Sequence, residues 1–153
     1  MLSKTVISGH HDFRLSFAKN TVKVNNTNKD DALRIILKET GNNGYDAVIL
    51  AVGSRQAVGD GIDLLKSKGR LIVFSGITGD TPVDLFKLHV RELEIKGACN
   101  DNNRLDEAIT VLSDGKITIK DLVTHKFSIT EYRKAFELAE KGRESAIKVA
   151  IVF

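Results

Sequence analysis

Short runs of consecutive apolar residues recur along the chain, and each ends at or near a glycine. The clearest run is Tyr45–Ser54 (YDAVILAVGS), and similar runs occupy Arg70–Gly76 and, more weakly, Lys4–Gly9. Antiparallel strands with one solvent-exposed face alternate polar and apolar residues, whereas strands that are covered on both faces are apolar throughout. These runs therefore predict buried strands of a parallel sheet.

Segments with a helical period lie between the predicted strands. Asn28–Thr40 carries one apolar stripe, and Gly41 after it is a typical helix end. A second helix is predicted to begin after Ser54, whose side chain can cap it, and to end at Gly69. The residues of this helix that are expected to face inward are Val58, Ile62 and Leu65.

The later part of the chain continues the alternation. Leu93–Cys99 and Ile147–Phe153 have the pattern of strands, and Asn103–Ser113 has the pattern of a helix. Strands that alternate with helices are typical of an α/β fold with a doubly wound parallel sheet, which has helices on both faces. The length of 153 residues is enough for one domain with a real core.

Ligands of doubly wound sheets bind outside the carboxyl ends of the strands. Three of the four predicted strand ends contain a glycine, which lets a ligand approach the backbone closely. Glycine is also common in such turns for its conformation alone, so each position has two explanations. Its recurrence at one edge favours a ligand site. The strand ends are Gly9-His10, Val52-Gly53-Ser54, Phe74-Ser75-Gly76 and Ala98-Cys99-Asn100.

Charge and composition exclude several classes of function. The net charge of +3 is small and spread along the chain, so nucleic-acid binding is not indicated. The single cysteine, Cys99, excludes an intramolecular disulfide, and no Cys/His spacing indicates a metal site. We therefore expect a reducing, cytoplasmic setting. No apolar run approaches the roughly 20 residues of a membrane span, and the N-terminus lacks the apolar core of a signal peptide.

Seven segments carry a resemblance to a known family. They are FRLSFAKN, YDAVILAVGS, GRLIVFSG, LHVRELEIKGA, DEAITVLSDGKI, LVTHKF and the closing AFELAEKG with AIKVAIVF. In order and spacing the chain resembles the C-terminal part of zinc-type medium-chain alcohol and polyol dehydrogenases, although no segment is specific alone. The resemblance implies a Rossmann-like dinucleotide-binding domain at residues 1–99. It implies that residues 100–153 pack back onto a catalytic domain.

The resemblance also implies parts that this sequence does not contain. In the family a preceding catalytic domain supplies the ligands of the catalytic zinc, so we expect no zinc site in this chain. The first cofactor-domain strand and its GxGxxG turn, which holds the pyrophosphate, should precede Lys4. That strand lies in the middle of the family's sheet, beside the strand at Tyr45–Val52. The implied fold is thus a partial doubly wound sheet with two unpaired strand edges.

The adenosine end of the cofactor distinguishes NADP from NAD. Where the family usually has an acidic residue that hydrogen-bonds the ribose, this chain has Gly9, followed by His10 and His11, with Arg14 nearby. A carboxylate repels a ribose 2′-phosphate, whereas glycine leaves room for one and cationic groups suit it. We therefore predict NADP rather than NAD. The alternative is that Gly9 serves the turn alone and that the histidines are solvated.

The other cofactor contacts that the resemblance implies are mostly made by the main chain. The residues so assigned are Val52, Gly53 and Ser54 on the adenine side, and Phe74, Ser75, Gly76, Gly97, Ala98 and Cys99 beside the nicotinamide. Lys148 matches a basic position near the pyrophosphate, although a lysine in a terminal strand is often merely exposed. No catalytic residue is predicted in this chain.

Two hypotheses for the function stay open. In the first, the chain is the cofactor-binding part of an alcohol or polyol dehydrogenase and is inactive alone. In the second, it is a non-catalytic subunit or truncated remnant that self-associates or pairs with a complementary N-terminal chain. The family forms its dimer contact at the strand that resembles Leu93–Cys99, which implies a homodimer in either case. The substrate alcohol is not indicated, because the missing half builds most of the substrate pocket.

Overall fold

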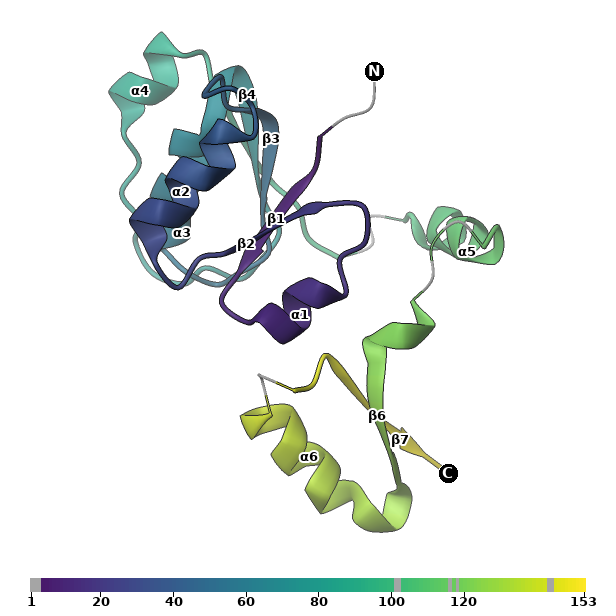
Figure 1. The fold of residues 1–153 in the computed structure, drawn as a ribbon. Coiled ribbons are helices and arrows are strands. Elements are labelled where there is room, and N and C mark those ends of the chain that lie inside the picture. The colour runs from purple at the N-terminus through teal and green to yellow at the C-terminus, as the bar shows by residue number, and fades with distance from the viewer. Residues whose placement is uncertain (1–3, 101–102, 116, 118, 143–144) are drawn as a thin grey trace. The chain divides into compact units, whose positions relative to one another are not determined.

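A computed structural model describes residues 4–100, 103–115, 117, 119–142 and 145–153. The chain divides into two compact units: unit 1 comprises Met1–Ala32 and Asn103–Phe153, and unit 2 comprises Leu33–Asn102. The elements, most of which are labelled in Figure 1, are β1 (Val6–Gly9), α1 (Asp12–Ser16), β2 (Val22–Asn25), α2 (Lys29–Lys38), β3 (Tyr45–Leu50), α3 (Gln56–Leu64), β4 (Leu65–Val73), α4 (Leu85–Val90), β5 (Glu94–Gly97), α5 (Leu105–Ser113), the 3-10 turn η1 (Lys120–Leu122), β6 (Val123–Ser128), the 3-10 turn η2 (Ile129–Glu131), α6 (Tyr132–Lys141) and β7 (Lys148–Val152).

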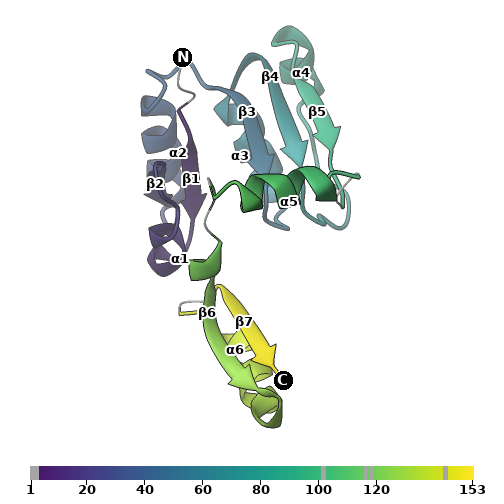
Figure 2. The ribbon, with the colours of Figure 1, turned by 90° about the vertical axis from the view of Figure 1, so that its right-hand side faces the viewer.

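Unit 2 is built on a three-stranded parallel sheet in the order β3-β4-β5, whose strands lie side by side in Figure 2. Val48 on β3 is opposite Leu71 on β4, which in turn is opposite Ile95 on β5. Helix α3 packs against β3 and β4. Full burial of a leucine side chain stabilises a fold by about 1.5–3 kcal/mol, so the core of unit 2 is a substantial source of stability. This core consists of Leu50, Val58, Ile62, Leu65, Leu71 and Leu93.

The helix predicted between Ser54 and Gly69 is shorter than expected, and its predicted cap is wrong. The N-cap residue of α3 is Arg55, with no side-chain cap bond, and the helix ends at Leu64. Leu65 is buried, but it belongs to β4 and is paired with Tyr45. The register shifts immediately after this pair, and a Cβ at Gly69 would lie 3.0 Å from the Tyr45 carbonyl oxygen. Helix α3 therefore ends where β4 begins its pairing with β3, which is before the predicted end at Gly69.

Unit 1 contains two parallel strand pairs, each with a helix in contact with both strands. Helix α1 packs on β1 and β2, and helix α6 packs on β6 and β7. Leu15 of α1, Val24 of β2 and Ala135 of α6 are buried. The apolar stripe of α5 is present as predicted, but Leu105 and Ile109 on it are 58% and 52% exposed. Helix α5 therefore presents an apolar face to its surroundings.

The prediction of an α/β fold with parallel strands is confirmed. The strands form three separate parallel sheets, β1-β2, β3-β4-β5 and β6-β7, rather than one. Within the described residues, β1 is paired only with β2, and β3 is paired with β4 on one edge alone. The strand at Tyr45–Val52, which contains β3, is the one that the resemblance places beside the missing strand. The predicted strands at Leu93–Cys99 and Ile147–Phe153 are present, shortened to Glu94–Gly97 and Lys148–Val152.

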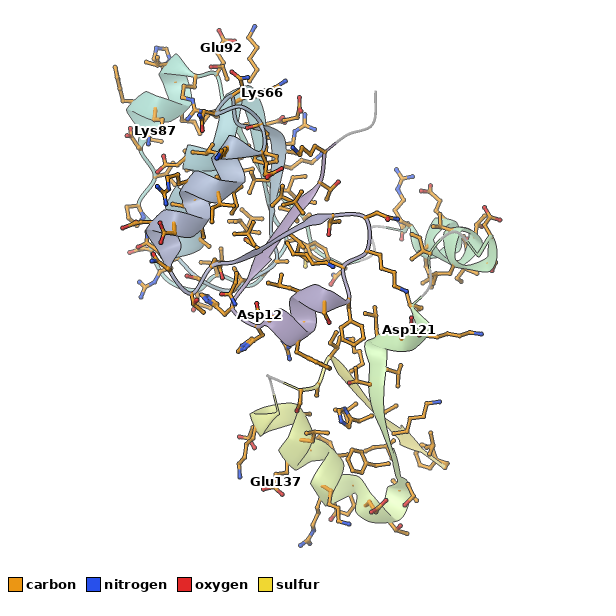
Figure 3. All side chains as sticks on the ribbon, viewed as in Figure 1. Asp12, Lys66, Lys87, Glu92, Asp121 and Glu137 are labelled. Carbon is orange, nitrogen blue, oxygen red and sulfur yellow. The ribbon has the colours of Figure 1, made fainter. Side chains whose placement is uncertain are left out.

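Ion pairs lie on the surface of unit 2. Lys66 Nζ is 2.5 Å from Asp46 Oδ1, and Lys68 Nζ is 3.3 Å from Glu92 Oε2; Figure 3 labels Lys66 and Glu92. Exposed pairs of this kind contribute little to stability, so the core of the unit rather than its surface charge stabilises it. In the part of the chain that the structure describes, no helix has the length and apolarity needed to cross a membrane.

Candidate functional site

The carboxyl ends of three parallel strands meet at one edge of unit 2. Two hydrogen bonds extend the pairing by one residue past the strands. The Phe74 N–H donates to the Leu50 carbonyl over 3.1 Å, and the Ala98 N–H donates to the Val73 carbonyl over 2.9 Å. The turns that follow β3, β4 and β5 are thereby held next to one another, as the alternation of strands and helices predicts for a ligand site.

Two glycines of the predicted site lie against each other at this edge. A Cβ at Gly53 would lie 2.9 Å from the Gly76 carbonyl oxygen, a distance that real Cβ atoms essentially never show. Gly53 is thus required for a close approach between two backbone segments. At Gly76 and Gly97, an added Cβ would meet no atom within 4 Å. The backbone of these two residues is therefore open to a ligand.

The Ser75 side chain joins the two neighbouring turns. Its Oγ lies 2.8 Å from the Val52 carbonyl oxygen and 3.3 Å from the Leu50 carbonyl oxygen. A hydroxyl has one proton to donate, and the shorter distance identifies Val52 as the main acceptor. The sequence analysis assigned to Ser75 and its neighbours contacts made mostly by the main chain, and it did not predict this role of the hydroxyl. A serine in the turn that follows a strand, as Ser75 is after β4, is a signal for such bonds to the backbone.

The surface around these turns is apolar. The side chains of Val52 and Phe74 are 51% and 56% exposed, and Ala98 and Cys99 are also exposed. Ser54 is partly buried, and its carbonyl accepts a hydrogen bond from the Ala57 N–H over 3.2 Å. An apolar surface with accessible backbone groups suits a flat organic ring better than a metal ion. No group of three metal-ligating side chains occurs among the residues that the structure describes.

The other predicted cofactor residues belong to unit 1. Gly9 ends β1, and its carbonyl accepts a hydrogen bond from the Asn26 N–H over 3.0 Å. A Cβ at Gly9 would meet the nearest atom, Leu15 Cδ2, at 3.5 Å, which is an ordinary contact. The turn therefore tolerates a side chain, and conformation alone does not explain the glycine. His10 after it is exposed, and His11 is the N-cap residue of α1.

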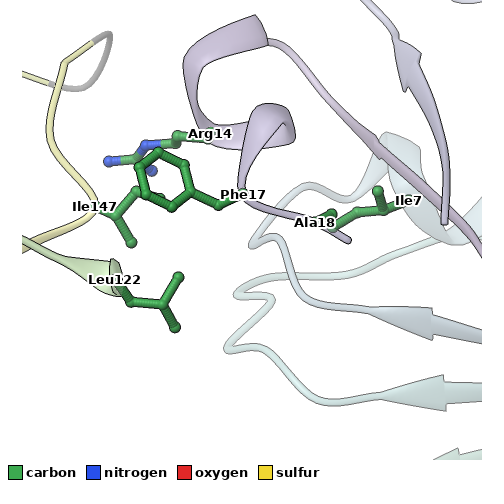
Figure 4. Close-up of a pocket in the computed structure, with 6 residues that line it drawn as sticks. All are labelled: Ile7, Arg14, Phe17, Ala18, Leu122 and Ile147. Atoms are coloured by element: carbon green, nitrogen blue, oxygen red, sulfur yellow. The ribbon is translucent and has the colours of Figure 1, made fainter. Parts of the chain in front are cut away.

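Arg14 points towards the C-terminal segment of unit 1. Its Nη2 donates to the Ala146 carbonyl over 3.0 Å, and the guanidinium lines a pocket of about 320 Å³ (Figure 4). Guanidinium has five donor N–H groups, so this bond leaves others for a phosphate. Lys148, the first residue of β7, is exposed. The other residues that line the pocket are Ile7, Phe17, Ala18, Leu122 and Ile147.

Two further polar residues lie at the carboxyl ends of β1 and β2. Asn25 is opposite Gly9 in the register, and its Nδ2 donates to Asp12 Oδ1 over 2.7 Å. The Asn25 Oδ1 accepts the Thr27 N–H over 3.0 Å. Neither Asp12 nor Asn25 was among the predicted site residues, although Asn25 is the last residue of β2. The Asp12 carboxylate lies three residues after Gly9 in the sequence, and it already accepts the hydrogen bond from the Asn25 amide.

The predicted site residues thus form two groups. Those after β3, β4 and β5 come together within unit 2, and the structure adds the Ser75 side chain to them. Gly9, His10 and His11 lie together at the end of β1 in unit 1, whereas Arg14 is directed to the Ala146 carbonyl. The roles of both groups stay predictions.

Residues 2–114 match the family described as zinc-binding dehydrogenase. The chain belongs to this family. Erythritol/L-threitol dehydrogenase of Mycolicibacterium smegmatis is 31% identical over 128 residues, which cover 83% of this chain and 35% of that protein. D-arabitol-phosphate dehydrogenase of Enterococcus avium is 33% identical over 128 residues, which cover 82% of this chain and 36% of that protein. The chain spans little more than a third of these curated relatives.

Solved structures agree with this membership. Zinc dependent alcohol dehydrogenase 2 from Streptococcus pneumonia, in its apo form, has a TM-score of 0.86 and 26% identity, over 98% of this chain and 45% of that one. The Escherichia coli CFT073 alcohol dehydrogenase rspB, solved with the cofactor NADH, has a TM-score of 0.88 over 98% of this chain and 44% of that one. At 22% identity the second similarity concerns the fold alone. The resemblance drawn from the sequence is confirmed.

Proposed function

We propose that this chain is the dinucleotide-binding part of an alcohol or polyol dehydrogenase. The observation that carries the proposal is the close approach of Gly53 to the Gly76 carbonyl, at the edge where three parallel strands end. The backbone beside this contact is open at Gly76 and Gly97, as a cofactor that binds main-chain groups requires. The polyol dehydrogenases among the relatives, and the NADH in the rspB structure, support this choice.

The residues of unit 2 would hold different parts of the cofactor. Val52, Gly53 and Ser54 would cover the adenine side, and the turns at Phe74–Gly76 and Gly97–Cys99 would flank the nicotinamide. The exposed apolar side chains of Val52 and Phe74 suit contact with flat rings. A bound nicotinamide supplies hydride transfer to or from the alcohol carbon. We assign no zinc ligand and no catalytic residue to this chain.

We further propose that NADP is preferred to NAD. Gly9 ends β1 without a carboxylate, and its turn has room for a side chain, so the glycine is not explained by conformation. His10 and His11 follow it and can donate hydrogen bonds to a ribose 2′-phosphate. Arg14 and Lys148 are the further basic residues of unit 1 that we assign to the phosphates.

Isothermal titration of the purified chain with NADP⁺ and NAD⁺ tests both proposals. We expect binding of NADP⁺ and at least tenfold weaker binding of NAD⁺. Gly9→Asp should reverse this preference, because a carboxylate repels a 2′-phosphate. Ser67→Asp adds the same charge at an exposed position of β4 away from the carboxyl edge and should change neither affinity. Absence of binding to both dinucleotides contradicts the proposed function.

Two parts of the chain take different roles in this proposal. Residues 1–99 would hold the cofactor, and residues 100–153 would pack against the catalytic part of the whole protein. The chain alone should therefore give no turnover. Absorbance at 340 nm after addition of NADP⁺ and simple polyols checks this, and clear cofactor reduction would contradict it. A complementary chain that supplies the missing half, and a cytoplasmic location, stay predictions.

We also propose that two copies associate through β5. All four residues of this strand are exposed, and within the described residues β5 is paired only with β4. Ile95 on it is 40% exposed. Ile95→Lys should convert a dimer into a monomer in light scattering coupled to size exclusion. Leu85→Lys, at a 70% exposed position of α4, is the matched control and should leave the dimer intact. A monomeric parent chain excludes the dimer.

A further inference from the structure

The Ser75 hydroxyl is the side-chain group that connects the turns after β3 and β4. We propose that Ser75 is a positioning residue, which fixes the turn at Val52–Gly53 in the conformation that receives the dinucleotide. This inference rests on the proposed function, because it assigns a role at the same site. It differs from a cofactor contact, since the hydroxyl is directed at protein backbone.

The geometry around Ser75 supports a role in placing the turn. The pairing of β3 with β4 ends with the bond from the Phe74 N–H to the Leu50 carbonyl. The Ser75 Oγ carries the connection two residues further along the chain, to the Val52 carbonyl at 2.8 Å. Gly53 follows directly and is in close approach to the Gly76 carbonyl. One hydroxyl therefore adjoins the tightest backbone contact of the candidate site.

The hydrogen bond also determines which groups of the turn a ligand can use. With its carbonyl bonded to Ser75, Val52 directs that oxygen towards the protein. The Val52 side chain stays 51% exposed and available to a ring. Without the hydroxyl, the exposed Val52 carbonyl would bind water instead, and the turn would lose the hydrogen bond that ties it to Ser75. The turn would then rotate, and both the exposed side chain and the Gly53 contact would shift.

Two variants separate the hydroxyl from the rest of the side chain. Ser75→Ala removes it, and Ser75→Thr keeps it in a residue that suits a strand end. We expect about five- to tenfold weaker NADP⁺ binding by S75A, the loss that one net hydrogen bond produces, and near-parental binding by S75T. In the free protein, the carbonyl ¹³C shift of Val52 should move in S75A and stay unchanged in S75T. If S75A does not fold, Ser75→Cys, a weaker donor of similar size, replaces it.

Each outcome decides the inference. Parental affinity in S75A, or equal weakening in S75A and S75T, overturns the positioning role. An unchanged Val52 shift in S75A overturns the hydrogen bond itself. If the parent chain binds neither dinucleotide, the proposed function fails and the positioning role fails with it. Because the Val52 shift is measured without ligand, it still determines whether the hydroxyl holds the turn, and the two failures are distinguishable.

Discussion

Gly53 approaches Gly76 so closely that a Cβ on Gly53 would lie 2.9 Å from the Gly76 carbonyl oxygen. Backbone rather than a flexible side chain occupies this space, so Gly53→Ala must displace one of the two turns. We expect destabilisation of about 1–3 kcal/mol, as for other overpacked positions, and a loss of dinucleotide affinity. Urea unfolding and calorimetric titration measure the two effects.

Gly76→Ala is the matched control for this contact. An added Cβ at Gly76 has no neighbour within 4 Å, so the stability should change by less than about 0.5 kcal/mol. If this variant unfolds as easily as the Gly53 variant, the close approach of the two turns is not the cause of the loss.

Two glycines of helix α3 should respond to alanine with opposite signs. A Cβ at Gly61 would lie 2.7 Å from Leu71 Cδ1 and 3.2 Å from Leu50 Cδ2, both in the core, whereas a Cβ at Gly59 would meet nothing. Gly59→Ala should stabilise unit 2 by about 0.5–1 kcal/mol through helix propensity. Gly61→Ala should destabilise it by about 1–3 kcal/mol. Urea midpoints of the two variants provide the comparison, and shifts of the same sign refute the packing of α3 on β4.

Tyr45 should make stability depend on pH in the alkaline range. Its hydroxyl donates to the Ile36 carbonyl over 2.8 Å, and burial, followed by the nearby Glu39 charge, raises the pKa of Tyr45 above its usual value. The pKa of Tyr45 is higher in the folded protein than in the unfolded protein. The stabilisation that comes from the protonated Tyr45 hydroxyl is therefore fully present below the unfolded-state pKa, and it is lost as the pH rises through the folded-state pKa.

Tyrosine ionisation at 295 nm measures this directly. The chain has two tyrosines and no tryptophan, so Tyr132→Phe leaves Tyr45 as the only absorbing phenol. We expect its transition at higher pH in the folded protein than in urea. Tyr45→Phe should lower the free energy of unfolding by about 1 kcal/mol at neutral pH. Above pH 10 the free energy of unfolding should decrease less steeply in this variant than in the parent chain. Identical transitions in the two states would contradict the burial of the Tyr45 hydroxyl in the folded protein.

Lys68 and Glu92 are both in the left-handed region, with φ values of 62° and 51°. Their ion pair is exposed at both ends, so its charge adds little. The backbone conformation affects stability more than the charge does, because a residue with a Cβ is strained by about 1–2 kcal/mol in this region. Lys68→Gly should therefore be more stable than Lys68→Ala by about 1 kcal/mol. Thermal unfolding of the pair tests this, and greater stability of the alanine variant contradicts the strain.

The apolar pattern predicts which segments form strands better than it predicts their ends. Tyr45–Ser54 contains β3 as expected, because a run of β-branched and apolar residues has few other stable environments. The start of β4 at Leu65 was missed, since Lys66–Lys68 are polar or charged and carry no strand pattern. Pairing with Tyr45 and the packed Gly69 place them in the sheet. These are long-range backbone contacts that periodicity does not encode.

For the candidate site, the sequence predicts which turns lie together but not where their side chains point. The rule that parallel strands end at one edge predicts that the turns after β3, β4 and β5 lie together, and hydrogen bonds between these strand ends hold them there. The direction of a side chain is not contained in that rule. The bond from Ser75 to Val52 and the orientation of Arg14 towards Ala146 depend on local rotamers and on contacts distant in sequence.

The unpaired edge of β3 has a consequence for handling the protein. Within the described residues, β3 has a strand neighbour on one side only, and Ala47–Val52 contains neither a charge nor a proline. A six-residue segment of this composition, on a strand with an unpaired edge, can pair with the same segment of another molecule and start amyloid-like cross-β stacking. Concentrated stocks of this chain should therefore form fibrils that bind thioflavin T, unless a partner covers the edge.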